Sequence, residues 1–252
     1  MRPVRRLARR MLRRLGYDIV RAESKWPSDF GPVDIALCEE VGPYTMTSPV
    51  AIVTLAEAVR DLTRRGITGA YVECGVWRGG SMMAIARTLL TLGRGDAELY
   101  LFDTFEGMTP PGPHDVSRSG RSAAALLNED RNRHDSLLWA RAPLEAVQAA
   151  MASVGYPDEH LHYVKGRVED TVPAQAPERI ALLCLDTDWY ESTQHELDHL
   201  YPRLQPGGML IIDDYGWWGG CRKATDEYFD SHGHLPFLAR VDDSGRRMAV
   251  KP

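Results

Sequence analysis

The most informative segment of the chain is AYVECGVWRGGS, residues 70–81. It begins as an apolar run typical of a buried strand and continues as a glycine-rich turn that leads into a helical pattern. Glycines let a backbone approach a ligand closely, and the N-terminus of a helix offers free N–H groups. The glycine spacing is not GxGxxG and no GKS or GKT follows, so neither a dinucleotide fingerprint nor a phosphate loop is predicted. A tight strand–helix turn that binds nothing is the alternative interpretation.

Short apolar runs alternate with helical patterns around this segment. Such alternation is typical of a doubly wound α/β fold, in which a mostly parallel sheet carries helices on both faces. We expect strands at residues 70–74, 99–103, 161–165, 180–186 and 209–213, helices at 49–65, 81–92, 123–154, 192–204 and 220–232, and a closing hairpin of 235–241 with 246–250. Residues 22–48 are predicted to be an irregular lead-in, and residues 106–122 a lid over the site or a plain surface loop.

Acidic residues stand in or after the first two predicted strands, at the sheet edge where α/β folds bind ligands. Glu73 lies two residues before Gly75 and suits a cationic ligand better than a pyrophosphate. Asp103 ends the next strand and is placed to accept hydrogen bonds from both hydroxyls of a ribose. Together they predict a site for an adenosine that carries a positive sulfonium and an amino-acid tail. A helix cap or a loop acid is the alternative role of Asp103.

A second set of acids follows two further predicted strands. Asp186 and Asp188 come after LLCL, residues 182–185, and the pair Asp213-Asp214 comes after MLII, residues 209–212. Carboxylates held close together are unfavourable unless they are protonated or bridged by a cation. Oxygen ligands from aspartate suit a hard ion, Mg²⁺ above all, with Mn²⁺ and Ca²⁺ as further candidates. Two unrelated acidic surface loops are the alternative.

Composition narrows the class of protein. The chain has 252 residues, 44% hydrophobic and 26% charged, and its formal net charge of −5 does not favour a nucleic-acid partner. Its four cysteines show no CxxC spacing, so we expect reduced core thiols in a cytoplasmic protein. Residues 1–15 form a basic amphipathic pattern, predicted to pack on the domain or on a partner in a homodimer. Weak contact of this helix with an anionic membrane surface is the alternative.

The ordered motifs resemble those of the macrocin O-methyltransferase (TylF-like) family over about residues 40–232. The resemblance rests on YTMTS (residues 44–48), ECGVWRGGS (73–81), DTFEG (103–107), LDTDWYEST (185–193), PGG (206–208) and DDY (213–215). It implies a class I, Rossmann-like methyltransferase domain with a seven-stranded sheet over residues 49–252, preceded by a helical extension and lead-in over residues 1–48. Two features depart from the family pattern: the arginine-rich N-terminal helix, and Thr187 where the family has Gly.

The resemblance also implies roles for individual residues. S-adenosylmethionine would be held by Thr45, Met46, Glu73, Gly75, Val76, Trp77, Ser81, Asp103, Thr104, Arg167, Val168 and Asp186. Mg²⁺ would be held by Asp186, Asp213 and Asp214, with Asp188 behind them or exchanging roles with Asp186. Asp186 would also be the catalytic base. His114, His134, Tyr190 and Trp217 are further candidates near the acceptor, with packing or loop roles as the alternative.

The activity implied is transfer of a methyl group from S-adenosylmethionine to a sugar hydroxyl of a glycosylated natural product or glycan. A hydroxyl of a small molecule that is not a sugar is one alternative. A cofactor-binding scaffold without catalysis is another, although clustered carboxylates have no use in a scaffold. An NAD-dependent oxidoreductase on the same kind of sheet is disfavoured by the missing GxGxxG and by Asp213-Asp214.

Overall fold

A computed structural model describes residues 26–131, 136–233 and 236–252 of the chain. Over these residues it shows a seven-stranded sheet in the order β3-β2-β1-β4-β5-β7-β6. The strands are β1 (Ala70–Cys74), β2 (Leu99–Asp103), β3 (Leu161–Lys165), β4 (Ile180–Leu185), β5 (Leu204–Ile212), β6 (Ala239–Arg240) and β7 (Arg247–Val250). The first five pair in parallel, whereas β7 runs antiparallel to both β5 and β6. The predicted mostly parallel α/β sheet with its closing hairpin is confirmed.

The direction of strand order reverses between β1 and β4, and this reversal positions the site. From β1 the chain proceeds outward to β2 and β3, and it then returns to β4 on the other side of β1. Connections that leave β1 and β4 in opposite directions open a crevice at their carboxyl ends. Every residue of both strands is buried, as expected for the centre of a parallel sheet covered on two faces.

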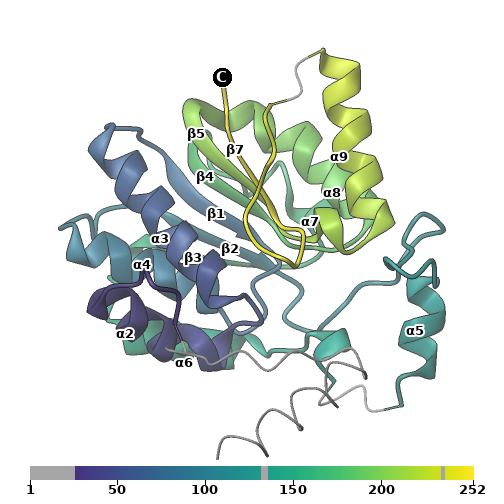
Figure 1. Cartoon of the computed structure of the whole chain (residues 1–252), viewed down its shortest axis with the longest axis horizontal. Coiled ribbons are helices and arrows are strands. Elements are labelled where there is room, and N and C mark those ends of the chain that lie inside the picture. The colour runs from purple at the N-terminus through teal and green to yellow at the C-terminus, as the bar shows by residue number, and fades with distance from the viewer. Residues whose placement is uncertain (1–25, 132–135, 234–235) are drawn as a thin grey trace, which may run out of the picture. The chain divides into compact units, whose positions relative to one another are not determined.

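Helices cover both faces of the sheet (Figure 1). On one face α3 (Pro49–Arg64) packs against α4 (Gly80–Thr91), and α4 packs against α6 (Leu144–Val154). On the other face α8 (Tyr190–His199) packs against both α7 (Val168–Thr171) and α9 (Gly219–His232). Helix α3 begins with Pro49 at its first position after Ser48, whose hydroxyl accepts the Ala51 N–H at 3.2 Å.

The helix predicted over residues 123–154 is wrong in its middle. The structure forms α5 (Ala123–Glu129) and α6, which begins only at Leu144, with residues 132–135 outside the described part. Pro143 precedes α6 and disfavours helical backbone at the residue before it. Ala140 has a left-handed φ of 42°, which no continuous helix accepts. The segment between the two helices is therefore free to line the crevice.

The lead-in predicted to be irregular contains a helix, α2 (Pro32–Val41). It has proline at its first position and stops where Gly42 and Pro43 follow. The helix predicted over residues 192–204 ends at His199, because Pro202 turns the chain into the 3₁₀ segment Tyr201–Arg203. As a result β5 begins at Leu204, five residues earlier than predicted.

Two compact units divide the chain, Met1–Ile35 and Ala36–Pro252. In the described part of the first, the rings of Trp26 and Phe30 stack with centroids 6.4 Å apart. The predicted amphipathic helix of residues 1–15 lies outside the described residues, and the functional division at residue 48 stays a prediction. All four cysteines are buried thiols. No helix in the described ranges combines the length and apolar content that a membrane crossing needs.

Candidate active site

A cavity of about 720 Å³ opens at the carboxyl ends of β1, β2, β4 and β5. It brings together residues that are far apart in the sequence. All the residues predicted to bind cofactor or metal line it, namely Thr45, Met46, Glu73, Gly75, Val76, Trp77, Ser81, Asp103, Thr104, Arg167, Val168, Asp186, Asp213 and Asp214. Their individual roles stay predictions, but they share one cavity.

The glycine-rich turn after β1 is shaped by a close approach to the next strand of the sheet. Gly75 has φ +84°, and a Cβ on it would lie 1.9 Å from the carbonyl oxygen of Asp186. No larger residue fits there without moving the end of β4. The following N–H groups of Val76 and Trp77 donate to Oδ2 of Asp103, at 2.8 and 3.1 Å. Asp103 therefore ties the turn after β1 to the end of β2.

Asp103 is held by its own turn as well. Its Oδ1 accepts the Phe105 N–H at 2.7 Å, and the Gly166 N–H donates to its carbonyl oxygen at 3.0 Å. Burial raises the pKa of its carboxyl, against the lowering effect of the three N–H donors. Each carboxylate oxygen has two lone pairs, and Oδ2 already accepts two N–H groups, so the acceptor capacity that remains for a ribose hydroxyl is on Oδ1.

Glu73 is a buried acid without enough polar partners. It is 1% exposed, and its Oε2 has no hydrogen-bond partner among the described residues. Burial and then the charge of Asp186 raise its pKa to about 8. A cationic group in the cavity would relieve this unfavourable burial, which is the property expected of the neighbour of an ammonium or sulfonium group.

The acid cluster lies where the pairing of β4 extends beyond the strand itself. The Asp186 N–H donates to the Cys74 carbonyl at 2.8 Å, and the Asp213 N–H donates to the Leu185 carbonyl at 2.9 Å. Asp186 and Asp213 thereby take neighbouring positions, with Asp214 next along the chain. One carboxylate oxygen from each of the three lies within 4.8 Å of the others.

This donor set fits a hard divalent cation. The Oδ2 atom of Asp214 is buried and has no hydrogen-bond partner among the described residues. Burial raises the pKa of Asp186 to about 6 against the lowering effect of the Arg246 charge, and burial and the neighbouring carboxylates raise that of Asp214 well above its ordinary value. A bound Mg²⁺ or Mn²⁺ would neutralise three converging carboxylates, and two of them, Asp186 and Asp214, have raised pKa values.

Asp188 faces a different partner. It adopts a left-handed backbone with φ 68°, and its Oδ1 accepts the indole N–H of Trp218 at 2.6 Å. Burial and the charge of Asp186 raise its pKa to about 7. The Trp218 ring packs edge-on against that of Trp189 at 5.1 Å. The carboxylate of Asp188 is thus engaged beside the cluster rather than in the group of three.

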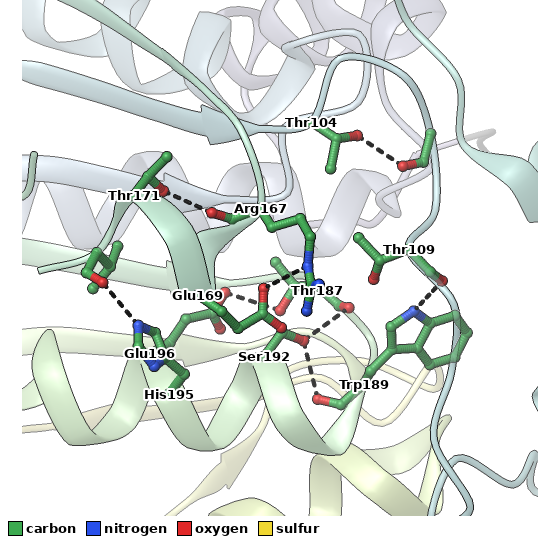
Figure 2. Close-up of polar contacts among 12 residues, drawn as sticks. Thr104, Thr109, Arg167, Glu169, Thr171, Thr187, Trp189, Ser192, His195 and Glu196 are labelled. Carbon is green, nitrogen blue, oxygen red and sulfur yellow. Dashed lines mark hydrogen bonds and ion pairs between the residues drawn. The ribbon is translucent and has the colours of Figure 1, made fainter.

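Hydrogen bonds hold the loop of residues 186–189 firmly onto α8 (Figure 2). Thr187 donates its hydroxyl to Oε1 of the buried Glu196 at 2.9 Å. The Ser192 hydroxyl approaches the carbonyl oxygens of Thr187 and Trp189 at 3.3 and 3.2 Å. The Trp189 indole donates to the Thr109 carbonyl at 3.0 Å, which joins the loop to the segment predicted to be a lid.

That segment, residues 106–122, lines the cavity at residues 107–109 and is pinned to α8 and α9 further along. The carboxylate of Asp115 is buried and accepts the N–H groups of Gly112 and Tyr190 at 2.6 and 2.8 Å, the latter at the start of α8. The Gly219 N–H, at the start of α9, donates to the Val116 carbonyl at 2.8 Å. Hydrogen bonds to main-chain N–H groups at both places fit a fixed segment better than a mobile lid.

Comparison with known proteins assigns the chain to a family. The profile of the macrocin-O-methyltransferase (TylF) family matches residues 38–247. The chain belongs to that family. Members are S-adenosylmethionine-dependent O-methyltransferases, and this chain is one.

Two curated relatives and one solved structure support the assignment. The chain is 35% identical to the 8-demethyl-8-(2,3-dimethoxy-alpha-L-rhamnosyl)-tetracenomycin-C 4'-O-methyltransferase of Streptomyces olivaceus, over 80% of this chain and 74% of that protein. It is 32% identical to the mycinamicin III 3''-O-methyltransferase of Micromonospora griseorubida, over 80% and 76%. The structure of the O-methyltransferase NovP superposes with a TM-score of 0.71 at 26% identity, covering 82% of each chain.

In this methyltransferase, residues 166–169 border the cofactor cavity from the β3 side. Arg167 precedes α7 and pairs with Glu169 at 3.3 Å (Figure 2). Its carbonyl accepts the Thr171 hydroxyl at 3.0 Å, which fixes the turn. That this turn borders the adenine of the cofactor stays a prediction.

Three of the further candidates fall in different places. Trp217 lines the cavity and is 49% exposed. His114 and Tyr190 do not line it: their rings pack 4.7 Å apart, and the Tyr190 hydroxyl donates to Glu227 at 2.8 Å. Packing at the surface is thus the role the structure gives them. His134 lies outside the described residues.

Sequence reasoning missed Arg246 of the methyltransferase. This side chain is 4% exposed and forms an ion pair with Asp213. Its Nη2 also donates to the Thr47 hydroxyl at 2.9 Å, in the segment of residues 44–48 that borders the cavity. The register of the closing hairpin is the signal that locates it: Arg247 pairs with Ile212, so Arg246 falls beside Asp213.

Proposed function

We propose that this methyltransferase acts on a sugar hydroxyl of a glycosylated natural product or glycan, with a divalent cation, Mg²⁺, held by Asp186, Asp213 and Asp214. The observation that carries the proposal is the meeting of these three carboxylates with the glycine-rich turn of β1 in one cavity. The cofactor turn and the acid cluster touch directly, since Gly75 packs on the Asp186 carbonyl.

Each end of the cofactor has a matching group in the cavity. Asp103 would accept the ribose hydroxyls, and residues 166–169 would border the adenine. Glu73 would face the positive methionine end, where its buried carboxyl needs a cation. Thr45 and Met46 would close the site from the 44–48 segment. With the cofactor held in this way, its methionine end would lie beside the acid cluster at the end of β4.

The acids of the cluster would activate the acceptor. A sugar hydroxyl is a weak nucleophile because its pKa is far above neutrality. A divalent cation bound here would supply positive charge that lowers that pKa. Asp186 lies nearest the cofactor turn and would take the hydroxyl proton while the oxygen attacks the methyl carbon in line with the sulfur. Asp213 and Asp214 would hold the cation together with Asp186.

Apolar residues in the cavity lining support an acceptor whose sugar carries an apolar group. Of the eight large apolar side chains that are markedly exposed among the described residues, half line this cavity: Met46 (53%), Val50 (39%), Leu137 (61%) and Trp217 (49%). Arg118 stacks over the Trp217 ring at 5.6 Å. A free sugar would leave these apolar side chains exposed to water, whereas the aglycone of a glycoside would cover them. One curated relative is named for a rhamnosyl-tetracenomycin C acceptor, which agrees with this substrate class, and the other for mycinamicin III.

A methyl-transfer assay tests the proposal. The full-length protein is incubated with S-adenosylmethionine and Mg²⁺ and with matched sets of glycoside, free sugar and aglycone, and products are identified by mass spectrometry. Methylation of the glycoside sugar, lost in excess EDTA and restored by Mg²⁺, is expected. Methylation of the aglycone alone would instead support a hydroxyl that is not on a sugar. Full activity in EDTA would remove the cation from the mechanism.

A further inference from the structure

Arg246 is a buried cation whose only described charged partner is a predicted metal ligand. It is 4% exposed, its Nη2 contacts both Asp213 and the Thr47 hydroxyl, and its Nε has no hydrogen-bond partner among the described residues. Its place is fixed by the backbone, because Gly245 has φ +95° and packs against Gly216 just after the acid pair. The guanidinium of Arg246 is therefore held close to the carboxylates of the acid cluster.

The cavity has few other positive charges to balance its acids. Among the described residues that line it, Arg167 is the other basic residue, and that side chain is about half exposed and paired with Glu169. Arg246 by contrast lowers the pKa of both Asp186 and Glu73 through its charge. It is therefore the main cation that makes this cluster of carboxylates tolerable in a buried site.

A divalent cation and the guanidinium compete for the same carboxylate. Two cations on Asp213 repel each other in a weakly screened site, because Arg246 is buried, so a bound divalent cation would loosen the pair of Arg246 with Asp213. Loosening the pair frees Asp213 for the metal, and it also weakens the bond from Arg246 to Thr47. Metal binding and the seating of the 44–48 segment are thereby connected through one side chain.

We propose that Arg246 is a positioning residue that acts as the resident cation of the acid cluster: it neutralises Asp213 and holds Thr47 while the metal is absent, and it yields Asp213 when the metal binds. This inference rests on the proposed metal site. It does not depend on the acceptor, because neither of its consequences involves methyl transfer.

The test compares Arg246→Gln with Arg246→Lys in the full-length protein without acceptor. Mn²⁺ affinity is measured by titration calorimetry, and S-adenosylmethionine affinity is measured in EDTA. Arg246→Gln should bind Mn²⁺ about tenfold more tightly, since the competing charge is gone, and should bind the cofactor several-fold more weakly. Arg246→Lys keeps the charge, so its Mn²⁺ affinity should stay within about twofold of wild type. Arg240→Gln, an exposed arginine on the same hairpin, is the matched control and should change neither affinity.

A merely structural role for Arg246 would not tighten metal binding. Unchanged or weaker Mn²⁺ binding by Arg246→Gln therefore overturns the inference, while the metal site itself stands if wild type binds Mn²⁺. If neither protein binds Mn²⁺, the metal site and this inference both fall. Should Arg246→Gln not fold, hydrogen exchange in the wild type decides: Mn²⁺ added without cofactor should speed exchange at residues 45–48, and protection there would contradict the inference.

Discussion

The hydroxyl of Thr187 donates a 2.9 Å hydrogen bond to the carboxyl of Glu196, which is completely buried in α8. Burial raises the pKa of Glu196 well above its ordinary value, against the lowering effect of the hydrogen bond from Thr187. Thr187 stands between Asp186 and Asp188. The hydrogen bond therefore connects the helix behind the sheet directly to the acid cluster.

Replacing Thr187 with Val should destabilise the protein by about 1–3 kcal/mol, because it leaves the buried Glu196 without its donor. Glu196→Gln keeps a carbonyl oxygen that accepts the Thr187 hydroxyl, and it should change the unfolding free energy by less than about 1 kcal/mol. Urea unfolding followed by circular dichroism measures both. Equal losses in the two variants would show that the hydroxyl of Thr187 is not the group that matters.

Glu73 should make stability depend on pH. Its pKa is raised from 4.5 to about 8, so between these values the folded state holds a proton that the unfolded state has released. The contribution of Glu73 to the free energy of unfolding is therefore most favourable below pH 4.5. It falls by roughly 3–5 kcal/mol as the pH rises from 4.5 to 8. Glu73→Gln removes this contribution and should flatten the profile between pH 5 and 8.

Urea unfolding at several pH values, in EDTA and without cofactor, compares the slopes of wild type and Glu73→Gln. The other buried acids affect both proteins equally, so the difference between the slopes reports Glu73. The variant should also bind S-adenosylmethionine more weakly at pH 7.5. Parallel profiles would mean that the carboxyl of Glu73 is already ionised in the fold.

Asp213→Asn and Asp214→Asn should each abolish methyl transfer while leaving cofactor affinity within a few-fold of wild type. Both residues belong to the proposed metal set, and neither touches the turn that would hold the methionine end. Initial rates and cofactor titration provide the two readouts. As a control, Asp198→Asn alters a carboxylate on α8 away from the cavity lining. A parallel loss of cofactor binding would place the pair in the cofactor site instead.

Asp115→Ala should destabilise the fold by about 2–4 kcal/mol, because one buried carboxylate supplies the acceptors for two main-chain N–H groups. Activity at low temperature should fall as well, since residues 106–122 lose their anchor on α8. Thermal unfolding and rates at two temperatures test this. Glu178→Ala, an exposed acid in a turn, is the comparison and should shift the midpoint by less than a degree or two.

The sheet could be predicted because its signals are local. The apolar runs of β1, β2 and β4 are short, and each meets glycine or aspartate at its carboxyl end. Parallel topology brings those ends together, so the order of strands and acids along the chain was enough to assign Asp103, Asp186 and Asp213 to one edge. Helix boundaries were less accessible where proline acts, as at Pro143 and Pro202.

Arg246 could not be predicted, because its importance arises from pairing across the sheet. The residue sits 33 positions after Asp213 in a charged turn, where a solvated arginine is the ordinary expectation. Only the antiparallel register of β7 on β5 buries it beside the acids. The partners of Asp188 and Glu196 were hidden for a similar reason, since Trp218 and Thr187 reach them through tertiary packing.

Main-chain hydrogen bonds continue the pairing of β4 as far as Asp186 and Asp213. The groups proposed to react and the rim of the cavity are therefore built from different parts of the fold. The groups proposed to react are held by the rigid sheet, while other parts of the cavity lining come from residues 44–50, 107–109 and 137–140. Those segments can change in length or composition without shifting a strand. Exchanging them between relatives is therefore a practical route to new acceptors with the reaction centre left intact.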